Sequence, residues 1–280
     1  MNPAAWSWRV VLVRPRNPLN IGAAARAMAN FGFRDLVVVN PYEPTWQETR
    51  SAVGAEDVVK SARAVPTLLE AIEDTVLVAG TTAGSRRHLR RELVPLNDLP
   101  GWLAARRGSP GGRPFGAVTT TRAGTRPAPT SEIRSPAGRA VLSAALLFGS
   151  EKTGLSNDEM SHCQALVRIP TSPGCPSMNL GQAVAVCCYE LARCGLVSNR
   201  PGGARIHRSD PATGQSLAHL FDRAARVLDT VGYLKPKSRA ATLLKLREFL
   251  LELRLTNYDA RILGGVLAQI EWKLGKKLSP

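Results

Sequence analysis

Residues 9–26, RVVLVRPRNPLNIGAAAR, decide the fold, because they change from one hydrophobic pattern to another within a single turn. Arg9 to Val13 is rich in β-branched residues, which is typical of a buried strand. Asn20 to Phe31 is rich in alanine and closed by Gly32, which is typical of a helix. The segment therefore predicts a strand that leads through a polar turn directly into a helix.

The same alternation of strand and helix patterns continues along the chain. The predicted elements, in order, are a strand at Leu36 to Val39, a helix at about Pro66 to Ile72, strands at Thr75 to Ala79, Ala140 to Phe148 and Leu166 to Ile169, and a helix at Leu180 to Arg193. Strands that alternate with helices favour a parallel sheet covered by helices on both faces. We therefore expect an α/β fold.

Two segments divide the chain by composition. Residues from about 106 to 139 are rich in Gly, Pro, Thr and Arg, which predicts a flexible insertion. Residues 197–212 are typical of a linker, and apolar residues recur beyond it with helical spacing. We expect an α/β domain at 1–196 that contains the insertion, and a small all-helical C-terminal domain at 213–280.

The charge is strongly positive: 37 Lys and Arg against 22 Asp and Glu give a formal net charge of +15 and a pI near 10.4. This excess favours a polyanionic partner, although a basic tail or a codon bias towards arginine would also produce it. Residues 1–9 lack an apolar signal core, and no stretch reaches the ~18 apolar residues of a membrane span. We expect a cytoplasmic protein without membrane contact.

The cysteines form no C-x-x-C pair, and no ligand set has zinc-finger spacing. His162, Cys163 and Cys175 are the best candidate zinc ligands, but they lack a second pair. We expect no metal.

Three polar loops are the candidate sites, because ligands of parallel sheets bind at the carboxyl ends of strands. The first, Arg14 to Arg26, has neither a G-x-G-x-x-G nor a G-K-[ST] motif, which disfavours a dinucleotide or phosphate loop. Asn20 would also serve as the helix N-cap. Arg26 lies among alanines and points either into a site or into solvent.

The second loop, Phe148 to Asn157, follows an apolar strand. Its Gly149 would let backbone approach a ligand closely, and Glu151 is placed to hold backbone amides. The third segment, Ile169 to Ala183, is rich in Pro and Gly at its start and runs into a helix that Ser177 or Asn179 would cap. A loop with this much proline is pre-shaped, which lowers the ordering cost of binding.

Taken together and in this order, the three loops resemble those of the TrmH-like branch of the SPOUT methyltransferases, and within it the TrmJ-type tRNA ribose methyltransferases. The resemblance includes residues 26–33 and 53–58, the strand end at residues 80–83, and the helical tail through Gly264. It implies a trefoil-knotted α/β domain, S-adenosylmethionine as the cofactor, a homodimer, and transfer of a methyl group to a ribose 2′-hydroxyl of RNA. In TrmJ-type enzymes the target is nucleotide 32 of the tRNA anticodon loop.

The resemblance also implies roles for individual residues. The cofactor would be held mainly by backbone groups of Thr81, Thr82, Ala83, Gly149, Ile169, Pro176, Ser177, Met178 and Leu180. The reacting hydroxyl would be served by Arg26, with Asn20, Glu151, Ser177 and Asn179 shaping the pocket. Because a guanidinium is essentially never deprotonated, we prefer Arg26 as a phosphate and alkoxide stabiliser over a general base.

Three alternatives remain from the sequence. The enzyme would modify another tRNA position or ribosomal RNA, or the chain would be a non-catalytic RNA-binding module; an oxidoreductase is disfavoured by the missing glycine motif.

Basic residues of the helical tail would suit phosphate contacts, although each alone would also fit a solvated helix surface. They are Lys235, Lys237, Arg239, Lys245, Arg247, Arg254, Arg261, Lys273, Lys276 and Lys277.

Overall fold

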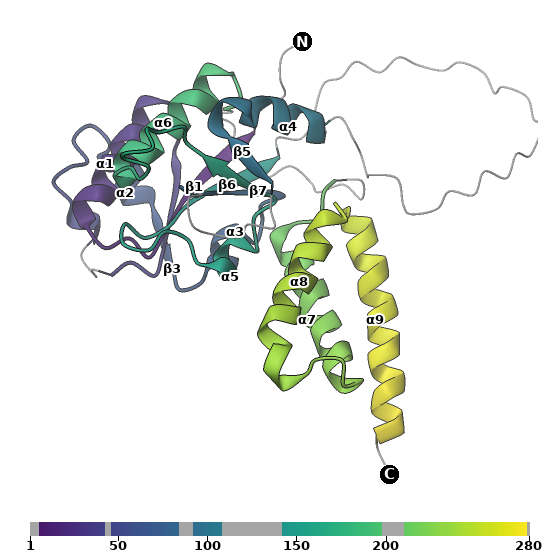
Figure 1. Ribbon diagram of the computed structural model, residues 1–280. Coiled ribbons are helices and arrows are strands. Elements are labelled where there is room, and N and C mark those ends of the chain that lie inside the picture. Colours follow the sequence, from purple (N-terminus) through teal and green to yellow (C-terminus); the bar gives the residue numbers. More distant parts are fainter. Residues whose placement is uncertain (1–5, 43–45, 84–91, 108–141, 198–209, 279–280) are drawn as a thin grey trace, which may run out of the picture.

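The computed structural model describes residues 6–42, 46–83, 92–107, 142–197 and 210–278. An α/β body and a group of three long helices make up this part of the chain (Figure 1). The insertion expected at about 106–139 lies almost entirely outside the described residues, and so do its arginines at 113, 122, 126 and 134. Most of the expected linker also lies outside them.

The body is built on a seven-stranded sheet in the order β3-β2-β1-β6-β4-β7-β5, and every pairing is parallel. The strands are β1 (Ser7–Val13), β2 (Asp35–Val39), β3 (Arg63–Val65), β4 (Leu77–Thr81), β5 (Leu93–Pro95), β6 (Ser143–Phe148) and β7 (Ala165–Arg168). Alternate residues of β1 face opposite cores: Val10 and Leu12 join one buried cluster, and Val11 and Val13 join the other. Both faces are covered, so the expected parallel α/β fold is confirmed.

Helices line both faces of the sheet. They are α1 (Pro18–Asn30), α2 (Glu56–Ser61), α3 (Leu68–Ile72), α4 (Leu99–Arg107), α5 (Asn157–Met160) and α6 (Leu180–Arg193), with short 3₁₀ turns η1 (Trp46–Glu48) and η2 (Leu96–Asp98). One face packs against α1, α2, α4 and α6, and the other against α3 and α5. Where α1 meets α6, a Cβ on Gly181 would lie 2.8 Å from the Cβ of Ala23. Glycine at this position therefore lets the two helices approach closely.

The helices beyond the sheet are α7 (Gly214–Thr230), η3 (Pro236–Ser238), α8 (Arg239–Glu252) and α9 (Asn257–Leu278). They share a small core of Ala212, Leu220, Leu250 and Ala260. The start of α7 is bonded to the body, because the Gly214 amide donates to the Thr75 carbonyl at 2.9 Å. Within the described residues, no helix is both long and apolar enough to cross a membrane.

Candidate functional site

The three candidate loops follow β1, β6 and β7; β1 pairs directly with β6, and β4 alone separates β6 from β7. β4 lies between β6 and β7, so the loops that follow these strands emerge side by side at the carboxyl edge of the sheet. The hydroxyl of Thr81 donates to the Leu147 carbonyl of β6 at 2.9 Å, and the Thr82 amide donates to the Val167 carbonyl of β7 at 3.0 Å. The loop of Thr81 to Ala83 is thereby tied to both of its neighbours.

Glu151 joins the second loop to the first. Its carboxylate accepts from the amides of Arg16 at 2.9 Å and Asn17 at 3.2 Å, and from Asn20 Nδ2 at 2.9 Å. The expected role of Glu151 in holding backbone amides is thus seen in the structure. Partial burial by itself would raise the pKa of Glu151, but the hydrogen bonds from Asn20 and the backbone outweigh it and lower the pKa. The carboxylate is therefore ionised at neutral pH.

Asn20 joins the first loop to the third. Asn179 Nδ2 donates to Asn20 Oδ1 at 2.9 Å, and Asn179 Oδ1 caps α6 by accepting from the Gly181 amide at 2.9 Å. Of the two caps considered for this helix, Asn179 is the one observed. The interpretation of Asn20 as the cap of α1 is wrong: Asn17 caps that helix, Pro18 begins it, and Asn20 lies inside its first turn. The side chain of Asn20 is therefore available to link two other loops.

Gly149 is required by its own loop. A Cβ at this position would lie 2.1 Å from the Gly154 carbonyl carbon and from the Leu155 amide nitrogen. The loop folds back here, because the Gly154 amide donates to the Ser150 carbonyl at 2.8 Å. Glycine at this position therefore permits a close approach of the chain itself; approach of a ligand to the Gly149 backbone stays a prediction.

The third loop leaves backbone groups available. In the described part of the chain, no acceptor is present for the amides of Ser177 and Met178. Pro176 and Ser177 are exposed, while Ile169 and Met178 are half-buried. Leu180 begins α6 and its side chain is buried in the core, so a ligand could contact this residue only through its backbone.

Arg26 is not brought into contact with the other predicted residues. Its side chain is exposed on α1, and among the described residues it has no hydrogen-bond or ion-pair partner. It follows Asn20 by six positions, which corresponds to about 9 Å along a helix. Within one chain, the site therefore consists of Asn20, Glu151, Asn179 and the strand-end loops, and Arg26 lies further along α1.

Sequence reasoning missed an ion pair that supports the first loop. Arg14 directly follows β1 with a positive φ of 50° and donates from Nη2 to Glu159 Oε2 at 3.0 Å. The Glu159 side chain is buried, and it also accepts from the Ser156 amide at 2.6 Å in a capping box at the start of α5. The spacing of Ser156 and Glu159 is the signal that could have drawn attention to this carboxylate. The partner, Arg14, has no such local signal.

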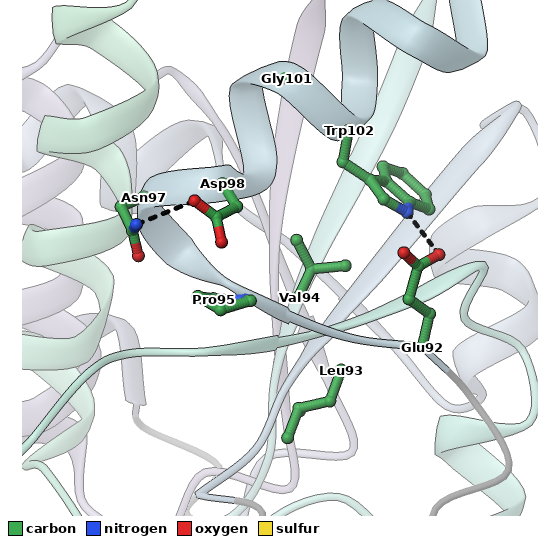
Figure 2. Close-up of a pocket in the computed structure, with 8 residues that line it drawn as sticks. All are labelled: Glu92, Leu93, Val94, Pro95, Asn97, Asp98, Gly101 and Trp102. Carbon is green, nitrogen blue, oxygen red and sulfur yellow. Dashed lines mark hydrogen bonds between the residues drawn. The ribbon is translucent and has the colours of Figure 1, made fainter.

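A separate pocket lies along β5, η2 and α4 (Figure 2). Trp102 Nε1 donates to Glu92 Oε2 at 2.8 Å on one side, and Asn97 Nδ2 donates to Asp98 Oδ1 at 2.9 Å on the other. None of the predicted site residues lines it. The candidate residues lie in the joined loops and not in this pocket.

The fold and the joined loops define a class of parallel α/β enzymes that bind their ligand at the carboxyl edge of the sheet. Within that class the chain belongs to the SpoU rRNA methylase family, whose match extends over residues 7–189. The sequence-based assignment to the RNA methyltransferases is thereby confirmed.

Individual relatives match nearly the whole chain. An uncharacterized tRNA/rRNA methyltransferase of Haemophilus influenzae is 30% identical over 268 residues, which cover 95% of each protein. The tRNA (cytidine/uridine-2′-O-)-methyltransferase TrmJ of Salmonella typhimurium is 31% identical over 265 residues, or 94% of this chain and 96% of the relative. The crystal structure of TrmJ from Z. mobilis superposes with a TM-score of 0.71 at 26% identity, covering 94% of this chain and 98% of that one.

Proposed function

We propose that this protein transfers a methyl group from S-adenosylmethionine to the ribose 2′-hydroxyl of nucleotide 32 in the tRNA anticodon loop. The observation that carries the proposal is the chain of hydrogen bonds from Glu151 through Asn20 to Asn179, which joins three loops of a SpoU-family fold into one site. The names of the TrmJ relatives, which are tRNA 2′-O-methyltransferases, support tRNA as the substrate.

The residues at the strand ends fit the cofactor. The amides of Ser177 and Met178 are donors without an acceptor among the described residues, and the ring nitrogens of adenine are acceptors. The three adjacent strand ends offer further backbone groups at Thr81, Thr82, Ala83, Gly149 and Ile169, and the segment that follows β7 offers those of Pro176 and Leu180. When bound, S-adenosylmethionine supplies a methyl group on a positively charged sulfur.

The role of the chain in this reaction is alignment. Methyl transfer needs oxygen, carbon and sulfur in line, and holding two reactants in that geometry supplies much of the rate. The Glu151 carboxylate fixes the first loop through its amides, while Asn20 and Asn179 fix the distance between the first and third loops. Ser177 stands next to this network and helps to shape the acceptor pocket.

Arg26 serves the acceptor. A guanidinium remains protonated, so we assign it the phosphate beside the reacting ribose and the negative charge that develops on the 2′-oxygen. General-base action by Arg26 is the less favoured version.

A homodimer would complete this arrangement. Arg26 is exposed and unpaired among the described residues of its own chain, and the exposed Leu19 and Tyr189 lie on α1 and α6, which pack side by side. Contact through these helices would cover the apolar side chains and bring Arg26 towards the loops of a second copy.

We further propose the trefoil knot of the SPOUT fold and the division into a catalytic domain at 1–196, a linker at 197–212 and a helical domain at 213–280.

The helical domain would hold tRNA by its phosphates. Two of the predicted basic residues form ion pairs within the chain, Arg239 with Asp229 and Arg247 with Asp158. The side chains of Lys276 and Lys277 lie outside the described ones. Besides the paired Arg239, the exposed members are Lys235, Lys237, Lys245, Arg254, Arg261 and Lys273. Their positive charge would supply affinity for RNA without selecting a sequence. We expect the reaction to occur in the cytoplasm.

The test is to map 2′-O-methyl positions in tRNA from a strain that lacks this protein and to restore the protein from a plasmid. We expect one methylation, at nucleotide 32, to disappear and return. Loss at another tRNA or rRNA nucleotide would overturn the assigned position. If tRNA from the deletion strain keeps all its 2′-O-methyl groups and calorimetry detects no cofactor binding, the proposed methyltransferase activity is overturned. A non-catalytic RNA-binding module would then be favoured.

A further inference from the structure

An arginine and a tyrosine form an exposed pair at the edge of the site. The guanidinium carbon of Arg16 lies 4.9 Å from the centre of the Tyr42 ring, within the range of a cation–π contact. Tyr42 is nevertheless 65% exposed. Its position is set by its backbone, because the Tyr42 amide donates to the Pro15 carbonyl at 3.1 Å. One face of the ring is therefore backed by a cation while much of the side chain remains open.

The pair is attached to the same carboxylate as the proposed acceptor site. The Arg16 amide donates to Glu151 Oε2 at 2.9 Å, and Asn20 Nδ2 donates to Glu151 Oε1 at 2.9 Å. Arg16 and Asn20 are four residues apart, so they are separated by at most about 14 Å even for an extended chain. Neighbouring nucleotides of one RNA strand can reach both positions.

An exposed ring backed by a guanidinium suits a particular ligand. Unpaired RNA bases are bound by stacking on aromatic side chains and on the planes of arginine, and any base can do so because every base has a π face. An anticodon loop presents such unpaired bases next to nucleotide 32. Resting on the proposed function, we propose that Arg16 and Tyr42 form a stacking site for a nucleobase that flanks the methylated ribose.

The test uses full-length protein and tRNA transcripts in which one nucleotide near the methylated ribose is replaced by an abasic one, at each of the two positions on either side. We expect Tyr42→Ala to raise the KM for intact tRNA about fivefold or more, since stacking of one base on an aromatic side chain has an effect of that size. Tyr42→Phe, which keeps the ring, should stay within about twofold of the wild type.

The abasic series identifies the base. One abasic substitution should weaken the wild type by the same factor as Tyr42→Ala, and that substitution should have no added effect on Tyr42→Ala. Arg16→Ala should also raise the KM, because it removes the guanidinium that backs the Tyr42 ring. It keeps the backbone amide that donates to Glu151. Tyr233→Ala is the matched control, since Tyr233 is 63% exposed and its ring makes no cation–π contact with the described residues.

The outcomes separate this inference from the proposed function. The stacking site would be overturned if every abasic substitution weakened Tyr42→Ala as much as it weakens the wild type, or if Tyr42→Ala had a normal KM. Methylation by the wild type would stand in both cases. A fall in melting temperature or in S-adenosylmethionine affinity for Tyr42→Ala would instead assign the pair a structural role and also overturn the site. A wild type that leaves every tRNA unmethylated would overturn the proposed function itself.

Discussion

Asn20 Nδ2 donates to Glu151 Oε1 at 2.9 Å, although the two residues are 131 positions apart in the chain. The same side chain accepts from Asn179 through its other atom, Oδ1. An asparagine is suited to this position because its amide carries one donor group and one acceptor. Aspartate has the same shape but offers only acceptors when ionised.

This geometry predicts different effects of two changes at one position. Asn20→Asp should lower kcat/KM more than Asn20→Ala, for which we expect a loss of about tenfold, because the new carboxylate would face that of Glu151. The double variant Asn20→Asp with Glu151→Gln should recover part of the loss, since a glutamine amide can donate to the aspartate. Asn30→Asp, at the other end of α1, is the control. A double variant worse than Asn20→Asp alone would contradict the arrangement.

Replacing Arg26 should separate chemistry from cofactor binding. We expect Arg26→Ala to abolish methylation while the affinity for S-adenosylmethionine stays within about threefold, because the exposed side chain is assigned to the acceptor. Methylation assays and calorimetry on the same preparation check this. Arg34→Ala, at an exposed arginine beyond the same helix, should leave both quantities unchanged. Loss of cofactor binding by Arg26→Ala would refute the assigned role.

The Arg14 and Glu159 pair should support the first loop. Arg14→Met leaves a buried carboxylate without its cation, so we expect the free energy of unfolding to fall by about 1–3 kcal/mol. A value near the lower end of this range is expected because Arg14 is partly exposed. The double variant Arg14→Met with Glu159→Gln should be more stable than Arg14→Met. Urea unfolding measures both, and equal stability of the two variants would show that the charge of Glu159 is not the cause.

Burial, with Arg247 as a further cause, lowers the pKa of His162 to about 4. In the unfolded chain this imidazole gains a proton near pH 6.5, whereas in the folded protein it stays neutral until pH 4. Its stabilising effect is therefore complete above pH 6.5 and is lost as the pH falls towards 4. Between pH 7 and pH 5 the free energy of unfolding should drop by about 2 kcal/mol from this group.

Comparison of variants isolates that contribution. His162→Gln should show a smaller decline in stability from pH 7 to pH 5 than the wild type, whereas His219→Gln, at an exposed position on α7, should decline as the wild type does. Denaturant unfolding at the two pH values provides the measurement. Parallel declines for all three proteins would exclude His162 as the titrating group.

Affinity for tRNA should fall steeply between low and moderate salt, because each phosphate that is neutralised releases counterions. The double variant Lys235→Ala with Lys237→Ala should reduce the slope of log affinity against log salt by about 0.7–0.9 for each phosphate that these lysines neutralise in the wild type. Lys60→Ala, at an exposed lysine on α2, serves as the control. A flat salt response of the wild type would discard the basic helical surface as a phosphate-binding site.

The fold class was readable from the chain because hydrophobic periodicity is local. The buried run of β1 and the small-residue pattern of α1 predicted a strand and a helix, and the structure has both. The edge strands β3 and β5 were missed, since each has three residues, too few to show a period. The cap of α1 was misassigned because Asn17 and Asn20 are both good cap residues, and the choice depends on where Pro18 begins the helix.

By itself, the sequence determined the longer strands and helices and singled out three candidate loops, because these patterns depend on neighbouring residues. Only the tertiary structure decided which loops touch. The sheet pairs β1 with β6 and separates β6 from β7 only by β4, and Asn20, Glu151 and Asn179 thereby meet from three distant segments. Hydrogen bonds between such residues form only after the strands have chosen their neighbours, and no pattern within a short window of sequence records that choice.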